Sequence, residues 1–106
     1  MPIPVLVTVY PESDKVSRVE ELVKWVTEEV RKNEPAVSDY RSYEGRGDEP
    51  EHTVFMIFFH IENEEELHKR KSLPHHQHIA KVTDEEQLMR RPLKYVVLNG
   101  LTQWSR

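Results

Sequence analysis

Three stretches of the chain are rich in β-branched and aromatic residues, a composition typical of strands. They are Ile3–Tyr10, His52–Ile61 and Tyr95–Leu101. A fourth and more polar stretch, Val37–Glu44, precedes the glycine-containing segment Gly45–Pro50. Glycine tolerates the positive φ angles that many turns need, so this segment is expected to be a turn. The pattern therefore predicts four strands, with a turn between the second and the third.

A long amphipathic helix is predicted between the first two strands. Its apolar residues recur at steps of three and four, which places them on one helical face. They are Val16, Val19, Leu22, Val23, Val26 and Val30. Ser13 or Asp14 is expected to cap the start of this helix. Glu34-Pro35 is expected to end it, because a residue that precedes proline is disfavoured in the α region.

A second helical region follows the third strand, and it is predicted to be broken into pieces. Asn63–Glu66 has the form of a capping box before a short helix around Leu67. Pro74 interrupts that helix, and His75–Val82 is predicted to form a further one. Thr83–Glu86 has the form of a second capping box. The helical content between the last two strands therefore comes in short segments.

The order of these elements is β-α-β-β-α-β, the pattern of an α+β, ferredoxin-like fold. It predicts a four-stranded antiparallel sheet with helices on one face. The length of 106 residues fits one domain over residues 1–106. Thr102–Arg106 is expected to be a C-terminal tail.

Both faces of the predicted sheet are apolar, which bears on the oligomeric state. Side chains alternate along a strand, so Val54, Met56, Phe58 and His60 point one way. The other face of the same strand carries Phe55, Ile57, Phe59 and Ile61. Helices cover one face only, so we predict a homodimer in which two sheets pack face to face. The alternative is that twisted edges and long polar side chains cover the second face.

Composition excludes several classes of protein. The chain has no cysteine, which excludes a disulfide scaffold, a thiolate nucleophile and a cysteine-based zinc site. Its net charge of −4 argues against nucleic acid as a partner. No apolar run reaches the roughly 18 residues of a membrane span, and Met1–Tyr10 lacks the features of a signal peptide. We therefore expect a cytoplasmic protein with no membrane partner.

The order and spacing of several motifs resemble the antibiotic biosynthesis monooxygenase family of dimeric α+β barrels. The motifs are Glu34-Pro35-Ala36, Val54–Ile61, Asn63–Leu67 and Leu73-Pro74-His75, and the resemblance spans roughly Val5 to Leu101. It implies a ligand cavity between sheet and helices, and oxygenation without metal or flavin. Members oxidise anthrones, hydroquinones and related phenols; others cleave haem, act on breakdown products of signalling molecules, or have no known activity.

The chain departs from the family pattern at functional positions. Phe59-His60-Ile61 stands where many members carry a Glu and a Trp or Tyr. Arg70 stands near the place where many carry a His. Haem-cleaving members use an Asn on the first strand and a Trp on the third, and the corresponding strands here have neither. The resemblance therefore disfavours haem cleavage.

Two histidines are the candidate catalytic residues, because a neutral imidazole with a pKa of about 6.5 is a suitable general base. His60 lies in an apolar strand and would face the cavity if its side of the sheet meets the helices. Otherwise it is a core or interface histidine. His75 matches the Pro-His step of the family, and its alternative is simple packing at a helix start.

Five further residues are candidates for binding the substrate. Trp25 could lie under a flat aromatic ligand, although core packing is the alternative, and Phe58 shares a face with His60. An arginine or tyrosine can hold an oxyanion, which makes Arg70 and Tyr43 candidates. Asn99 interrupts an apolar strand, which is unusual without a polar partner.

No metal ligands are expected. In a helix, His75 and His78 share a face, whereas His76 points about 100° away, which is poor geometry for three ligands. His76 is therefore expected to be solvated. A two-histidine site completed by His68 or Glu66 is the open alternative.

Two functions remain. The first is a cofactor-independent monooxygenase, or a related cyclase or tautomerase, that acts on a small aromatic of secondary metabolism and needs no cofactor. The alternative is a non-catalytic dimeric module of the same fold that binds a small ligand or has a structural role.

Overall fold

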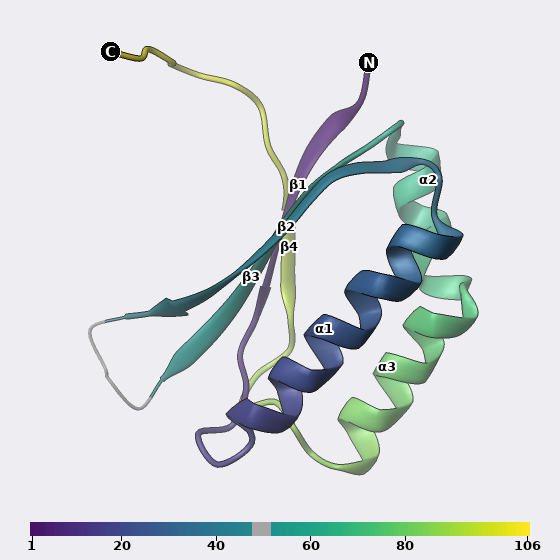
Figure 1. Ribbon diagram of the computed structural model, residues 1–106, viewed down its shortest axis with the longest axis vertical. Coiled ribbons are helices and arrows are strands. Elements are labelled where there is room, and N and C mark those ends of the chain that lie inside the picture. The colour runs from purple at the N-terminus through teal and green to yellow at the C-terminus, as the bar shows by residue number, and fades with distance from the viewer. Residues whose placement is uncertain (48–51) are drawn as a thin grey trace.

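The computed structural model describes residues 1–47 and 52–106 (Figure 1). Its sheet has four strands in the order β2-β3-β1-β4, and each neighbouring pair is antiparallel. The strands are β1 (Ile3–Val9), β2 (Val37–Arg46), β3 (Thr53–Ile61) and β4 (Lys94–Val97). The helices are α1 (Val16–Asn33), α2 (Glu64–Lys69), the 3-10 helix η1 (Arg70–Ser72) and α3 (Pro74–Glu85). All of these helices lie on one side of the sheet, so the predicted fold class is confirmed.

The core lies between the sheet and the helices. Val5 of β1 pairs with Phe59 of β3, and Val9 pairs with Phe55, so that these side chains share the helix-facing side. All of them are buried, together with Val19, Leu22, Val23, Ile57, Ile61, Val82 and Leu88. Burying each such side chain is worth about 1.5–3 kcal/mol, so this layer supplies the main stabilisation of the fold.

The odd-numbered residues of β3 face the helices, which decides where His60 lies. Leu6 of β1 pairs with Phe58, and Pro4 pairs with His60, on the opposite side of the sheet. These side chains are only partly buried, and the described helices all lie on the other side. The face that carries Phe58 and His60 is called the open face below. A cavity role for His60 requires that its side of the sheet faces the helices. The open face points away from them, so His60 lies outside the space between the sheet and the helices.

Helix ends agree with the sequence at three of the predicted boundaries. Helix α1 ends at Asn33, directly before Glu34 and the proline. The Asn63 side chain caps α2 by accepting a hydrogen bond from the Glu66 backbone N–H at 2.8 Å. Pro74 occupies the first turn of α3, where its missing N–H costs no hydrogen bond. The start of α1 differs, because Lys15 occupies the cap position and no side chain bonds the exposed amides.

Other boundaries differ from the prediction. Helix α3 continues to Glu85, so Thr83 lies inside it and opens no new helix. Strand β2 continues to Arg46 and includes Gly45. A Cβ at this position would approach the Val54 side chain to 3.0 Å, so a residue without a side chain suits the close pairing of the two strands. Residues 48–50 of the predicted turn lie outside the described part of the chain.

The last strand is shorter than predicted. It ends at Val97, and Leu101 is exposed. The Leu98 N–H still donates to the Pro4 carbonyl at 2.9 Å. Pro4 has no N–H to return, and β1 begins only one residue earlier, so the ladder has no partner to continue with. None of the described helices has the length and apolar character needed to cross a membrane.

Candidate functional site

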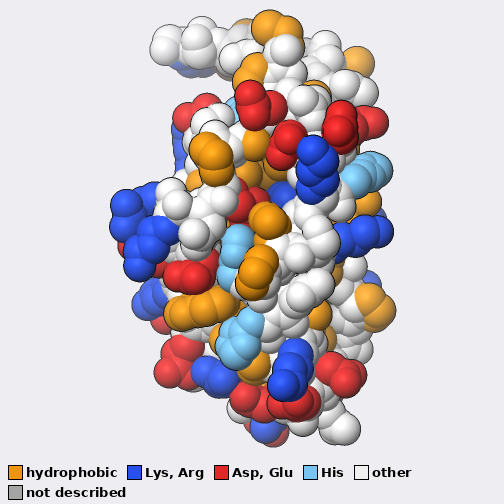
Figure 2. Space-filling view, turned by 90° about the vertical axis from the view of Figure 1, so that its right-hand side faces the viewer, with side chains coloured by type: hydrophobic (Ala, Val, Ile, Leu, Met, Phe, Trp, Pro, Cys, Tyr) orange, Lys and Arg blue, Asp and Glu red, His pale blue; other side chains and the backbone are white. Residues whose placement is uncertain are grey.

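A cavity of about 950 Å³ lies between the sheet and the helices. Its walls are mainly apolar, and they include Val5, Val7, Ile57 and Phe59 from the sheet and Leu22, Val23 and Val26 from α1. Tyr40, His68, Arg70 and His76 add polar atoms. Seen from the helix side, histidine side chains lie beside apolar ones, with charged side chains around them (Figure 2). This volume is at the upper end of the range for small-molecule sites.

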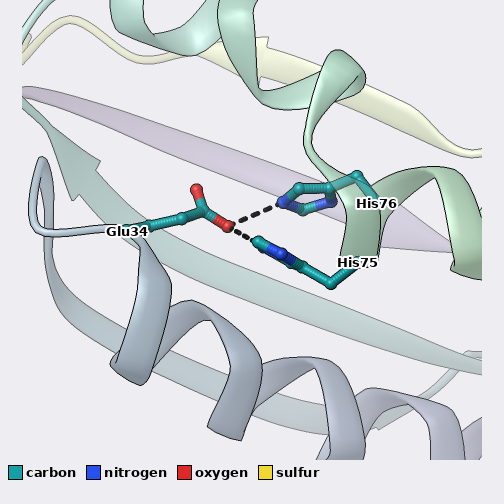
Figure 3. A group of neighbouring side chains, drawn as sticks. All are labelled: Glu34, His75 and His76. Atoms are coloured by element: carbon teal, nitrogen blue, oxygen red, sulfur yellow. Dashed lines mark hydrogen bonds and ion pairs between the residues drawn. The ribbon is translucent and has the colours of Figure 1, made fainter.

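Glu34 lies behind the polar wall and joins the residues that form it. It follows α1 directly, and its side chain is only 4% exposed. Its Oε2 accepts hydrogen bonds from His75 Nε2 at 2.6 Å and from His76 Nε2 at 2.8 Å (Figure 3). Its Oε1 accepts from Arg70 Nε at 2.6 Å. The end of α1, η1 and the first turn of α3 therefore meet on one carboxylate.

These partners decide the charge of Glu34. Burial alone would raise the pKa of the carboxyl. Hydrogen bonds from His76, Arg70 and His75, together with the positive charge of Arg70, outweigh burial and lower the pKa of Glu34 to about 2. The group is therefore an ionised carboxylate at neutral pH, and an ionised carboxylate only accepts hydrogen bonds.

The carboxylate also assigns the tautomers of both histidines. Since Glu34 accepts, Nε2 of His75 and of His76 carries a proton, and in the neutral form of either ring Nδ1 is therefore the acceptor. His75 is 5% exposed, whereas His76 is 22% exposed and lines the cavity. Among residues 1–47 and 52–106, the His76 ring hydrogen-bonds Glu34 alone. His76 is thus the oriented imidazole that a ligand in the cavity can reach.

Arg70 and Tyr40 supply donors beside this imidazole. The Arg70 guanidinium lies 4.4 Å from the centre of the Phe59 ring and bonds Glu34 through Nε and Nη2. Its Nη1 group makes no hydrogen bond to the described residues, which leaves these donors available. Burial raises the pKa of the Tyr40 hydroxyl, which therefore stays protonated. The wall thus combines one proton acceptor with two donors.

No family model matches the chain, and no curated protein matches it. Solved structures do. A protein of Nitrosomonas europaea, provisionally named an antibiotic biosynthesis monooxygenase, superposes with a TM-score of 0.77 at 19% identity, over 94% of this chain and 90% of that one. A protein of Deinococcus radiodurans with the same provisional name superposes with a TM-score of 0.74 at 15% identity, over 98% of this chain and 97% of that one. A protein of Pseudomonas aeruginosa superposes with a TM-score of 0.76 at 18% identity, over 95% of each chain.

The chain has the antibiotic biosynthesis monooxygenase fold. These identities show the fold alone, and the chemistry of the chain depends on the side chains around its cavity. In this fold, candidate chemistry is carried by Arg70 and His76 at the cavity wall together with Glu34 and His75 directly behind it. We call these four residues the Glu34 cluster.

Two of the sequence-predicted site residues belong to the Glu34 cluster. Arg70 lines the cavity of this antibiotic biosynthesis monooxygenase fold. His75 bonds Glu34 but is buried behind the wall, so it supports the site without lining the cavity. His75 is therefore placed to position the carboxylate, and its neighbour His76 is the histidine that lines the cavity.

The other predicted site residues do not line the cavity. His60 and Phe58 contact each other on the open face, where Tyr43 pairs with Met56. Trp25 of α1 is 39% exposed, with its ring 5.1 Å from that of His78 on α3. Asn99 is exposed beyond the end of β4. The placements of His60, Phe58 and Tyr43 follow from strand alternation, and that of Asn99 follows from the early end of the last strand. Trp25 is not one of the buried residues of α1.

Three residues of the site were missed or misjudged in the sequence. The sequence marks Glu34 only as a helix end, and it offers Tyr40 and Tyr43 alike as donors to a phenolic oxygen, of which Tyr43 is the predicted site residue. His76 was expected to be solvated because it points away from the helix face shared by His75 and His78. Glu34 approaches from outside α3 and reaches both neighbouring rings. Two adjacent histidines after a proline were the available signal, but the sequence gives no sign of which carboxylate they meet.

Proposed function

We propose that the chain is a cofactor-independent, monooxygenase-like enzyme of the antibiotic biosynthesis monooxygenase family. Its substrate is a small aromatic such as an anthrone, a hydroquinone or a polyketide-derived phenol. The observation that supports this best is the Glu34–His76 pair at the wall of a mainly apolar cavity of about 950 Å³. The apolar walls suit a flat aromatic, and the pair offers one oriented base.

The proton acceptor in this proposal is Nδ1 of His76. It takes a proton from the activated carbon or the hydroxyl group of the substrate. The Glu34 carboxylate holds the opposite ring nitrogen at 2.8 Å and stabilises the imidazolium that forms. Arg70 and Tyr40 donate hydrogen bonds to the oxyanion of the deprotonated substrate. The protein thus lowers the cost of forming the anion that reacts with dioxygen.

For an anthrone, the reaction balances without an external reductant. The carbanion gives one electron to dioxygen, and the two radicals combine to form a carbon–oxygen bond. The peroxide anion takes the proton from His76. Loss of water then converts the carbon from CH₂ to C=O, so that one oxygen atom enters the product and the other leaves in water. The substrate supplies all the electrons.

The test is oxygen uptake by chelator-treated protein with a panel of anthrones and hydroquinones. His76→Ala should lower the rate by about 10²-fold or more, as expected for loss of a general base. His78→Ala is the matched control, because His78 lies on the same helix and contacts Trp25 instead of Glu34. Absence of uptake across the panel would contradict the proposal. Ligand binding without uptake would support the non-catalytic module.

We also propose that the chain is a homodimer that pairs through the open face. Leu6, Met56 and Phe58 lie on this face, and they are only partly buried in one chain. A second copy would cover them. Light scattering should give the mass of two chains, and Phe58→Asp should shift it toward one. Trp104→Asp is the control, because it removes an exposed aromatic in the C-terminal segment. A wild-type mass of one chain would refute the dimer.

A further inference from the structure

Three potential metal ligands converge in the Glu34 cluster. They are Oε2 of Glu34, Nε2 of His75 and Nε2 of His76, and all lie within 4.8 Å of one another (Figure 3). They come from two segments, the end of α1 and the first turn of α3. We propose that this triad binds a divalent transition cation of the zinc class at the cavity wall.

The donor set points to this class of cation. Two imidazole nitrogens and one carboxylate oxygen suit zinc and similar metals, whereas magnesium and calcium prefer oxygen ligands. Both rings already direct Nε2 at the same oxygen, at 2.6 and 2.8 Å. Ligand atoms at about 2.1 Å from a tetrahedral zinc ion lie about 3.4 Å apart. Each of the two Glu34–histidine distances therefore needs to lengthen by less than about 1 Å to admit the cation.

The surroundings of the triad resemble a metal site with a free coordination position more than a structural zinc site with four protein ligands. The proposed ligand set has three protein atoms, and His76 lines the cavity, so a fourth position is available to water or to a ligand oxygen. Arg70 donates its shorter bond to the other carboxylate oxygen, Oε1, and can orient the carboxylate from outside the triad. Its positive charge also opposes a nearby cation, so we expect weaker binding than at structural zinc sites.

Cation binding would change the tautomers of the histidines. A metal on Nε2 needs the lone pair of that nitrogen, so the ring proton moves to Nδ1. The Nδ1 of His76 is the acceptor in the proposed oxygenation, and it would then be occupied. Cation binding and proton acceptance therefore exclude each other, and zinc should inhibit the enzyme. This consequence depends on the proposed function, whereas binding of the cation does not.

The experiment uses the full chain without an affinity tag, after chelator treatment and dialysis. Titration with Co²⁺ should produce the intense visible absorption of a four-coordinate site, saturating at one ion per chain, and Zn²⁺ should abolish it by displacement. Glu34→Gln and His76→Ala should each weaken Co²⁺ binding by about tenfold or more. His78→Ala should leave it unchanged, because His78 lies outside the triad. Circular dichroism checks that each variant is folded.

The outcomes separate this proposal from the oxygenase. A wild-type chain without the Co²⁺ band refutes the cation site, whatever the oxygen uptake. A band that survives both His76→Ala and Glu34→Gln, or that His78→Ala removes, also refutes it. A band with the expected variant pattern and no oxygen uptake supports the cation site and contradicts the oxygenase.

Discussion

Replacing Glu34 by Gln tests the electrostatics of the cluster directly. The substitution keeps the size of the side chain but removes the charge that accepts from Arg70, His75 and His76. The pKa of Glu34 is about 2 in the fold, against an ordinary value of 4.5. Each unit of difference corresponds to about 1.4 kcal/mol, so the ionised carboxylate contributes about 3 kcal/mol to stability at neutral pH.

The sign of the pH dependence follows from the lowered pKa. A carboxyl that is more acidic in the folded state contributes fully above its unfolded pKa of about 4.5. The contribution is lost as the pH falls through the folded pKa of about 2. The stability advantage of the wild type over Glu34→Gln should therefore shrink by up to about 3 kcal/mol as the pH falls from about 5 to about 2.

Urea unfolding of chelator-treated protein at a series of pH values measures this difference. Subtracting the variant from the wild type removes the effect of the other carboxyl groups, which titrate in both. Glu21→Gln is the control, because its exposed side chain lies 3.9 Å from Arg18 and should contribute less than about 0.5 kcal/mol. A difference between wild type and Glu34→Gln that stays constant down to pH 2.5 would refute the assigned charge.

Three other substitutions test separate parts of the structure. Leu88→Ala should cost about 2–5 kcal/mol in urea unfolding, because Leu88 is fully buried, and a loss below 1 kcal/mol would contradict its core position. Asn63→Ala should cost about 1 kcal/mol, because it removes the cap of α2; an unchanged unfolding midpoint would contradict this. Tyr40→Phe should lower oxygen uptake by about 10²-fold with little change in stability, and an unchanged rate would exclude the hydroxyl from the site.

Local patterns in the sequence predict most of the fold. The three- and four-residue steps from Val16 to Val30 identify α1, since a helical face depends only on neighbours in the chain. The side chain of Asn63 likewise caps a helix within its own turn. The end of β4 could not be found in this way, because it depends on Pro4 in a distant strand. The sequence therefore fails to predict the end of an element where a residue far along the chain determines it.

The candidate site depends on such distant partners throughout. Strand alternation separates His60 from Phe59 without saying which of them faces the helices, and the helix-facing residue proved to be Phe59. Arg70, His75 and His76 reach Glu34 across 36, 41 and 42 residues of sequence. A buried carboxylate is tolerated only when hydrogen bonds and opposite charge offset the cost of its burial. The ionised Glu34 therefore depends on Arg70, His75 and His76 being packed around it. The chemistry of the cluster is consequently a property of the packed sheet and helices, and substitutions that loosen the packing of α3 should alter it without touching any of the four residues.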